Sequence, residues 1–235
     1  MTAPIPPPAQ PAVTVAEVIA RMQTIDAALP AADGLACFNR MYLAVTQQVD
    51  AQVQQNQFGD AAFMAHLDVV FANRYFAAVD ALTQAPTAVP TAWAPLLAAR
   101  SLPGIEPIQY ALAGMNAHIN FDLPQAVVTA CTDLATAPGD GSHHEDYQRV
   151  DGLLDASEQS VRQAFETSQE RTVDRRVASV ATLVDNWSMN AARDVAWDEA
   201  LALWEIRDHP VATSLLLGAL GRTVAMVSRG LLIAL

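Results

Sequence analysis

The chain contains no lysine, and all 13 of its basic residues are arginines. A lysine amine is the side chain that forms Schiff bases with carbonyl substrates, so a mechanism of that type is excluded. The arginines are outnumbered by 25 acidic residues, which gives a net charge of −12. Proteins that bind phosphate backbones or anionic membrane surfaces need clustered positive charge. We therefore expect neither a nucleic-acid partner nor a membrane partner.

Cysteine and glycine are also scarce. Cys37 and Cys131 lie far apart among apolar neighbours, so they form neither a disulfide framework nor a zinc knuckle. We expect both to be unreactive thiols in the core. The sequence also lacks a phosphate-binding glycine loop, a dinucleotide fingerprint, a nucleophile elbow and the paired Glu-x-x-His of di-iron bundles.

The two ends of the chain differ in character. Residues 1–12 lack the basic and apolar regions of a signal peptide, and their prolines predict an extended, mobile tail. The segment from Val211 to Leu235 is apolar, but Arg222 and Arg229 interrupt it. No uncharged run therefore reaches the roughly 20 residues of a membrane-spanning helix. We expect this segment to be a buried core helix of a cytoplasmic protein.

Helical signals fill the rest of the sequence, in which 52% of all residues are hydrophobic. Thr14, Asp33, Asp60 and Ser142 are candidate N-caps, and the first and last begin capping boxes. No segment shows sustained strand alternation, and no linker marks a second domain. We predict a single all-α domain over residues 13–235, a bundle of eight or nine helices. The predicted helices are 14–29, 33–57, 60–84, 93–100, 107–120, one after Pro124, 142–169, 172–207 and 211–234.

The segment 114–124 places several polar residues in what otherwise reads as a buried helix. His118 shares a face with core residues, and Asp122 follows one turn later if the helix persists. Such a pair suits metal ligation, or acid–base chemistry in which a carboxylate orients an imidazole. Alternatively, the chain breaks before Pro124 and Asp122 caps the next helix. Asn116 and Asn120 lie nearby and are candidate substrate ligands.

Asp146 is a second carboxylate on a predicted apolar face, with His143 one turn before it. A buried carboxylate is costly unless it is paired or functional. Asp146 could therefore complete a site with His118 and Asp122, or form a buried ion pair with an arginine. Arg193, which shares a helix face with tryptophans, is the candidate partner and could equally clamp an anionic ligand.

Asp68 and Tyr75 lie at the edge of the apolar stripe of the predicted 60–84 helix. They could join the same interior site as substrate-binding groups, or remain at the edge of the core. Trp93, in a proline-rich stretch, is predicted to pack in the core or as a lid over the end of the bundle.

Several motifs together resemble a bacterial domain-of-unknown-function family, number 5995. The resemblance covers most of the chain apart from the proline-rich start, and the His-Ile-Asn-x-Asp-Leu stretch is its most specific part. It implies a helical fold and a shared interior site, but no particular reaction. This chain departs from the pattern with Val150-Asp151 where Val-Asn is expected. The motifs are Phe71–Tyr75, Trp93, Leu112–Asn120, Asp122–Leu123 and Asp146–Tyr147.

The leading hypothesis is an enzyme that acts on a small, largely apolar molecule inside the bundle. His118 would be an acid, a base or a metal ligand, and Asp122 and Asp146 would orient it or complete a metal site. A divalent ion such as zinc, iron or manganese would suit these ligands, and the reaction would be a hydrolysis, a cyclisation or an elimination. The alternatives are a non-catalytic binding protein and a purely structural polar network that fixes the helix register.

Overall fold

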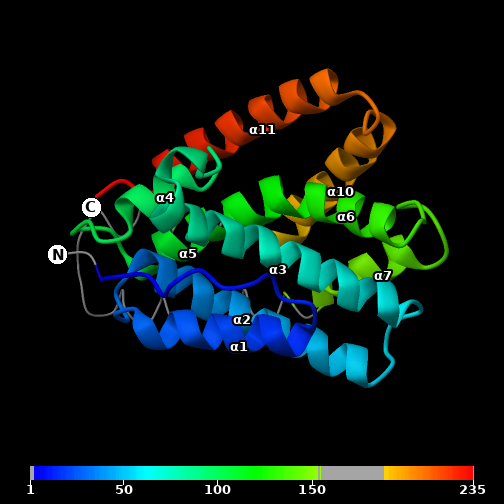
Figure 1. The fold of residues 1–235 in the computed structure, drawn as a ribbon, viewed down its shortest axis with the longest axis horizontal. Helices are drawn as coiled ribbons and strands as arrows, with labels where there is room; N and C mark the ends of the chain where they lie inside the picture. Colours follow the sequence, from blue (N-terminus) through cyan, green and yellow to red (C-terminus); the bar gives the residue numbers. More distant parts are fainter. Residues whose placement is uncertain (1–2, 153, 155–187, 235) are drawn as a thin grey trace.

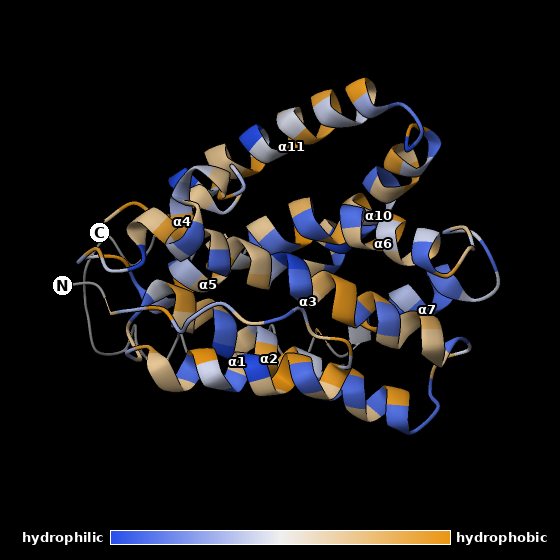
Figure 2. Cartoon of the chain, in the orientation of Figure 1, coloured by the Kyte–Doolittle hydropathy of each residue, from blue (hydrophilic) through white to orange (hydrophobic). Residues whose placement is uncertain are grey.

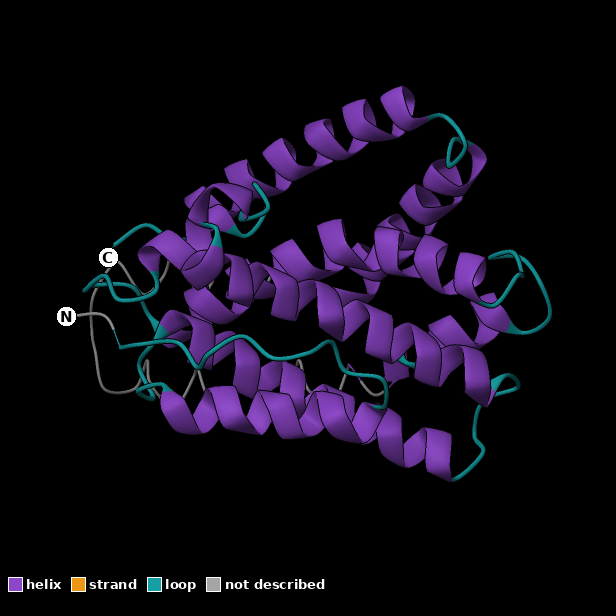
Figure 3. Cartoon of the chain, in the orientation of Figure 1, coloured by secondary structure: helices purple, strands orange, loops and turns teal. Residues whose placement is uncertain are grey.

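The computed structural model describes residues 3–152, 154 and 188–234 (Figure 1). Every regular element within these ranges is helical, and no strand occurs among them (Figure 3). The predicted all-α class is therefore confirmed. The predicted helical stretches 155–169 and 172–187 lie outside the described residues.

Three long helices begin the fold. Their first turns are closed by the predicted caps, because the side chains of Thr14, Asp33 and Asp60 each accept a hydrogen bond from a backbone N–H. These helices are α1 (Val15–Ala28), α2 (Gly34–Gln54) and α3 (Ala61–Gln84). The elements that follow are η1 (Pro86–Ala88), α4 (Ala94–Ala99), α5 (Pro107–Ala117), η2 (His118–Asp122), α6 (Leu123–Asp133), α7 (His143–Arg149), α10 (Met189–Glu205) and α11 (Pro210–Leu231).

The helices surround one hydrophobic core cluster, whose members extend from Ala12 to Leu231. α2 packs against α1 and α5, α3 against α6, and α6 against α10 (Figure 1). The approach of α5 to α2 depends on Gly114, since a Cβ there would lie 2.4 Å from the ring of Phe38. This close contact brings the chain that follows α5 into the centre of the bundle.

A break in the helix before Pro124 was expected, but the structure shows none. α5, η2 and α6 follow one another without interruption, and η2 is a π-helical turn in which the Leu123 N–H bonds to the His118 carbonyl. The wider turn lets proline, which has no N–H to donate, enter a continuous helix. π-turns of this kind are frequent at functional sites.

Residues 3–12 are not a free tail. They lie extended along the bundle, and their two ends are tied to it. The guanidinium of Arg100 donates to the Ala3 carbonyl, and the Asn73 amide exchanges two hydrogen bonds with the backbone of Ala12. The sequence could not show this, because the partners lie on distant helices.

α11 also differs from the expected buried core helix. Its C-terminal half packs on α5, while Val211, Leu215 and other apolar residues of its first half are exposed (Figure 2). Among the described helices it is the one whose length and apolar composition would allow it to cross a membrane. One such helix is weak evidence, since a core helix of a soluble protein has the same composition.

Candidate functional site

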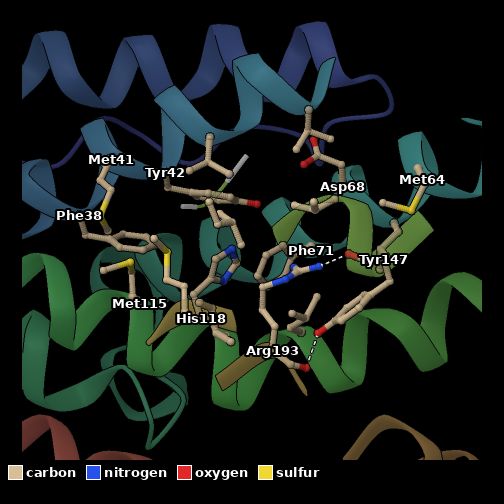
Figure 4. Close-up of a pocket in the computed structure, with 18 residues that line it drawn as sticks. Phe38, Met41, Tyr42, Met64, Asp68, Phe71, Met115, His118, Tyr147 and Arg193 are labelled. Carbon is tan, nitrogen blue, oxygen red and sulfur yellow. Dashed lines mark hydrogen bonds between the residues drawn. The ribbon is translucent and has the colours of Figure 1, made fainter. Parts of the chain in front are cut away.

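A narrow cavity of about 80 Å³ lies between α2, α3, η2 and α10 (Figure 4). Its walls are largely apolar, and four of the seven methionines of the chain contribute to them. Flexible methionine side chains suit a site that must fit around a guest. The apolar lining includes Phe38, Met41, Met64, Leu67, Met115 and Met189.

His118 is the central polar residue of this cavity. It is 2% exposed, and its Nδ1 lies 2.9 Å from Oδ2 of Asp122. The same carboxylate oxygen accepts a hydrogen bond of 2.8 Å from the indole N–H of Trp93. The predicted His118–Asp122 pair is therefore confirmed. The Asp122 side chain makes no capping bond to α6, so the expected alternative of a helix cap is wrong.

The hydrogen bond to Asp122 fixes the tautomer of His118. An ionised carboxylate can only accept, so the proton is assigned to Nδ1 and Nε2 keeps a lone pair. Nε2 is buried and has no hydrogen-bond partner among the described residues. The burial of His118 lowers the pKa of its imidazole, although Asp122 acts in the opposite direction. At neutral pH the ring is therefore uncharged and can accept a proton at Nε2.

Aromatic rings hold the imidazole in place. Phe71 stacks on it with ring centroids 3.5 Å apart and an interplanar angle of 3°. Tyr42 packs edge-on against the imidazole at 4.5 Å and also contacts Phe71, with ring centroids 5.7 Å apart (Figure 4). A ring held by packing and by a carboxylate has a defined orientation, which acid–base chemistry requires.

Two further polar groups line the same cavity without hydrogen bonds. The Tyr42 hydroxyl and Oδ2 of Asp68 are both buried, and neither has a partner among the described residues. The Thr46 hydroxyl lies close to that of Tyr42, but the two do not meet the geometry of a hydrogen bond. Burial, together with the negative charge of Asp50, raises the pKa of Asp68 to about 7. Buried polar groups are normally satisfied, so unsatisfied ones around a cavity indicate a place for a ligand.

Asp146 does not join this site. Its carboxylate accepts hydrogen bonds from the N–H groups of Gly59 and Asp60 and from the Ser142 hydroxyl, and it contacts Arg149. Burial alone would raise the pKa of Asp146, but these four donors outweigh burial and lower it. Asp146 therefore holds α7 on the start of α3 and has a structural role.

The proposed three-residue metal site is therefore not assembled. Within the described parts of the chain, no three His, Cys, Asp or Glu residues are arranged to hold a metal ion. His118 and Asp122 instead bond to each other. The polar residues on the predicted apolar faces belong to two separate clusters. The sequence did not predict this separation, because helix periodicity gives the face of a side chain but not its neighbours.

Arg193, the predicted partner of Asp146, pairs with Asp151, and Asp146 pairs with a different arginine, Arg149. Nε of Arg193 lies 2.7 Å from Oδ1 of Asp151, and its guanidinium also donates to the Tyr147 carbonyl and lies over the Tyr147 ring. Arg193 lines the cavity, yet its charge is already balanced. The aspartate at position 151, where the family resemblance predicts asparagine, supplies this balance.

Three other predicted substrate ligands face elsewhere. The Tyr75 hydroxyl donates to Asn39 in the core. Asn116 donates to the Val224 carbonyl and the Ser228 hydroxyl of α11, and Asn120 donates to Asn116. These three residues fix the packing of helices and do not line the cavity. Of Asp68 and Tyr75, which were predicted together at the edge of the apolar stripe, only Asp68 lines the cavity.

Ser142, His143 and the two cysteines have structural roles. The Ser142 hydroxyl donates to Asp146 and makes no cap bond, so the predicted capping box of α7 does not form. His143 is buried as expected and stacks on Phe63. Cys37 and Cys131 are free and buried, and burial raises the pKa of both thiols, to about 12 for Cys131.

The sequence reasoning missed Tyr42 and Phe71 as site residues and saw Trp93 only as core or lid. A signal for Tyr42 was present, because Phe38, Tyr42 and Thr46 repeat every four residues on one face of α2. Trp93 is fully buried, as expected of core, but it also orients Asp122.

Comparisons with known proteins agree with this picture at the level of the family. Residues 15–234 match the model of a family of unknown function, DUF5995. The chain belongs to this family. No curated protein and no solved structure shows a significant match. The family carries no stated reaction, so the function has to be argued from the cavity itself.

Proposed function

We propose that this DUF5995 protein is an enzyme that moves a proton on a small, largely apolar substrate, with His118 as the general base. One observation carries the proposal: in an apolar cavity, a neutral imidazole is held at Nδ1 by Asp122, and its Nε2 has no partner in the part of the chain that the structure describes. A carboxylate that orients an imidazole in this way is the arrangement that base catalysis uses.

Each neighbour of His118 has a defined part in this proposal. Asp122 is a positioning residue, because it acts only through the imidazole, and Trp93 orients Asp122 in turn. When Nε2 takes a proton, the imidazolium that forms is stabilised by Asp122. The apolar walls exclude water and strengthen this electrostatic contact.

The geometry favours proton transfer over the metal-assisted form of the hypothesis. A metal ligand would need Nδ1 or Nε2 of His118 together with further ligands, and the described residues offer no such group. Hydrolysis, cyclisation and elimination can all use a general base and so stay compatible with the site. The cytoplasmic location and the absence of nucleic-acid and membrane partners stay predictions from charge and composition.

A non-catalytic binding protein is the second candidate, because the unpartnered Tyr42 hydroxyl and Asp68 carboxylate would also orient a ligand that is not transformed. The two candidates differ in whether His118 must accept a proton. A protein that only binds its ligand needs a hydrogen-bonding group at position 118, and asparagine could provide that group. An enzyme needs a base there, and asparagine cannot act as one.

The decisive experiment compares the wild type with His118→Asn on mixtures of small apolar esters, ketones, alcohols and amines in D₂O. Mass spectrometry would follow the gain of water, the loss of water and the uptake of deuterium. We expect a compound that the wild type converts and that His118→Asn converts at least about 100-fold more slowly. Saturable binding without conversion would favour the binding protein. Equal conversion by both proteins would contradict the assignment of His118.

A further inference from the structure

Asp68 faces the cavity from α3, and no described residue gives its carboxylate a counter-charge. Its Oδ2 is buried without a hydrogen-bond partner, and no ion pair joins it to any described arginine or histidine. Asp50, the nearest charged neighbour on α2, is also negative and disfavours ionisation further. An unpaired carboxylate at this position destabilises the empty protein, which is a common property of binding sites.

The other groups around the cavity leave this charge uncompensated. α2 contributes the neutral Tyr42, and η2 contributes His118, whose lowered pKa keeps it uncharged at neutral pH. Tyr147 follows from α7 and Arg193 from α10, but Arg193 is already paired with Asp151. Among the described lining residues, ionised Asp68 therefore adds one uncompensated negative charge, inside walls of apolar and aromatic side chains.

We infer that the substrate of this cavity is a small amine, whose ammonium group pairs with Asp68 and whose short apolar body extends between the methionines towards His118. This inference rests on the proposed function and names the class of its substrate. An ammonium group would donate to the orphaned Oδ2 and could also reach the Tyr42 hydroxyl oxygen. The cavity of about 80 Å³ has room for a short chain only.

Three probes of matched size test the inference: butylamine, butan-1-ol and butanoate. Binding is followed by the methyl resonances of Met64 and Met115, which line the cavity, and the exposed Met226 on α11 is the internal control. At pH 8.5 we expect butylamine to bind at least about 10-fold more tightly than the other two, as a charge-assisted pair requires. A preference for the alcohol or the carboxylate, or no binding by any of the three, would overturn the inference.

Two matched variants separate local recognition from the overall charge of the protein. Asp68→Asn should weaken butylamine at least about 10-fold and leave butan-1-ol within about twofold. Asp133→Asn removes the same charge from an exposed position of α6 that does not line the cavity. It should change neither affinity, and equal losses in both variants would show that the amine is attracted only by net charge.

The pH dependence has a definite sign. The pKa of Asp68 is about 7 and the amine stays charged, so binding must release the proton of Asp68 at low pH. The affinity for butylamine should therefore rise about fourfold from pH 6.5 to 8.5, a range in which the lowered pKa of His118 keeps its ring mostly neutral. A neutral ligand that accepts a hydrogen bond from protonated Asp68 would show the opposite trend. These readouts measure binding alone, so failure here with conversion of another compound would reject the amine and retain the enzyme.

Discussion

Asp146 and Asp68 are both buried carboxylates on helices of the same bundle, with 0% and 8% of their surface exposed. Asp146 has four donors, and its pKa is lowered. Oδ2 of Asp68 has no partner within residues 3–152, 154 and 188–234, and the pKa of this carboxyl is raised to about 7. Both side chains are buried, so the partners decide the role. A carboxylate with all its bonds made holds the fold together, whereas one with none is available to a ligand.

The largest expected effect follows from Asp146→Ala. The substitution leaves the N–H groups of Gly59 and Asp60 and the Ser142 hydroxyl without their acceptor, at a position that is itself fully buried. We expect a loss of about 3–5 kcal/mol of unfolding free energy, and a melting temperature lower by about 10 °C. Thermal and urea unfolding measure this, with the exposed Asp133→Ala as control. A loss below about 1 kcal/mol would contradict the structural role.

Asp68→Asn should have the opposite effect. The pKa of Asp68 is raised from 3.8 to about 7, so its contribution to stability is complete below pH 3.8 and is lost as the pH rises through 7. The asparagine cannot ionise, and it should therefore increase the unfolding free energy by about 2–4 kcal/mol at pH 8. At pH 4 the gain should be small. Urea unfolding at both pH values checks this, and a variant less stable than the wild type at pH 8 would remove the contrast with Asp146.

The pH at which the His118 imidazole titrates is a third test of how burial and partners act on a buried group. Burial lowers the pKa of the imidazole, so its contribution to stability is present above pH 6.5 and is lost as the pH falls through the folded-state pKa. We expect the ring proton resonances of His118 to keep their neutral positions until the pH is below 6.5. The His118→Asn variant assigns the signal. A midpoint above 6.5 would mean that Asp122 outweighs burial and that the base is charged at neutral pH.

The smallest effect is expected for Glu145→Ala. The predicted capping box would have given Glu145 a share in α7, but the Ser142 hydroxyl binds Asp146 instead. Because Glu145 is exposed, its replacement should change the unfolding free energy by no more than about 0.5 kcal/mol. Thermal unfolding beside Asp146→Ala provides the measure. A loss close to that of Asp146→Ala would show that the two neighbours act together.

Periodicity and capping residues determined much of this protein. The all-α class, the starts of α1, α2 and α3, and the i, i+4 pairing of His118 with Asp122 all follow from local pattern. Such features depend on residues within a turn or two of each other. They can therefore be predicted from the sequence without knowledge of the fold.

The tertiary structure alone decided which polar residues meet. It separated Asp146 from His118, gave Arg193 to Asp151, turned Asn116 towards α11, and carried the helix through Pro124 by a π-turn. The reason is physical: a helix face fixes the direction of a side chain, but the partner comes from another helix whose position depends on packing across the whole core. Nε2 of His118 and Oδ2 of Asp68, which find no partner on the described helices, are consequences of that packing, and they define the site.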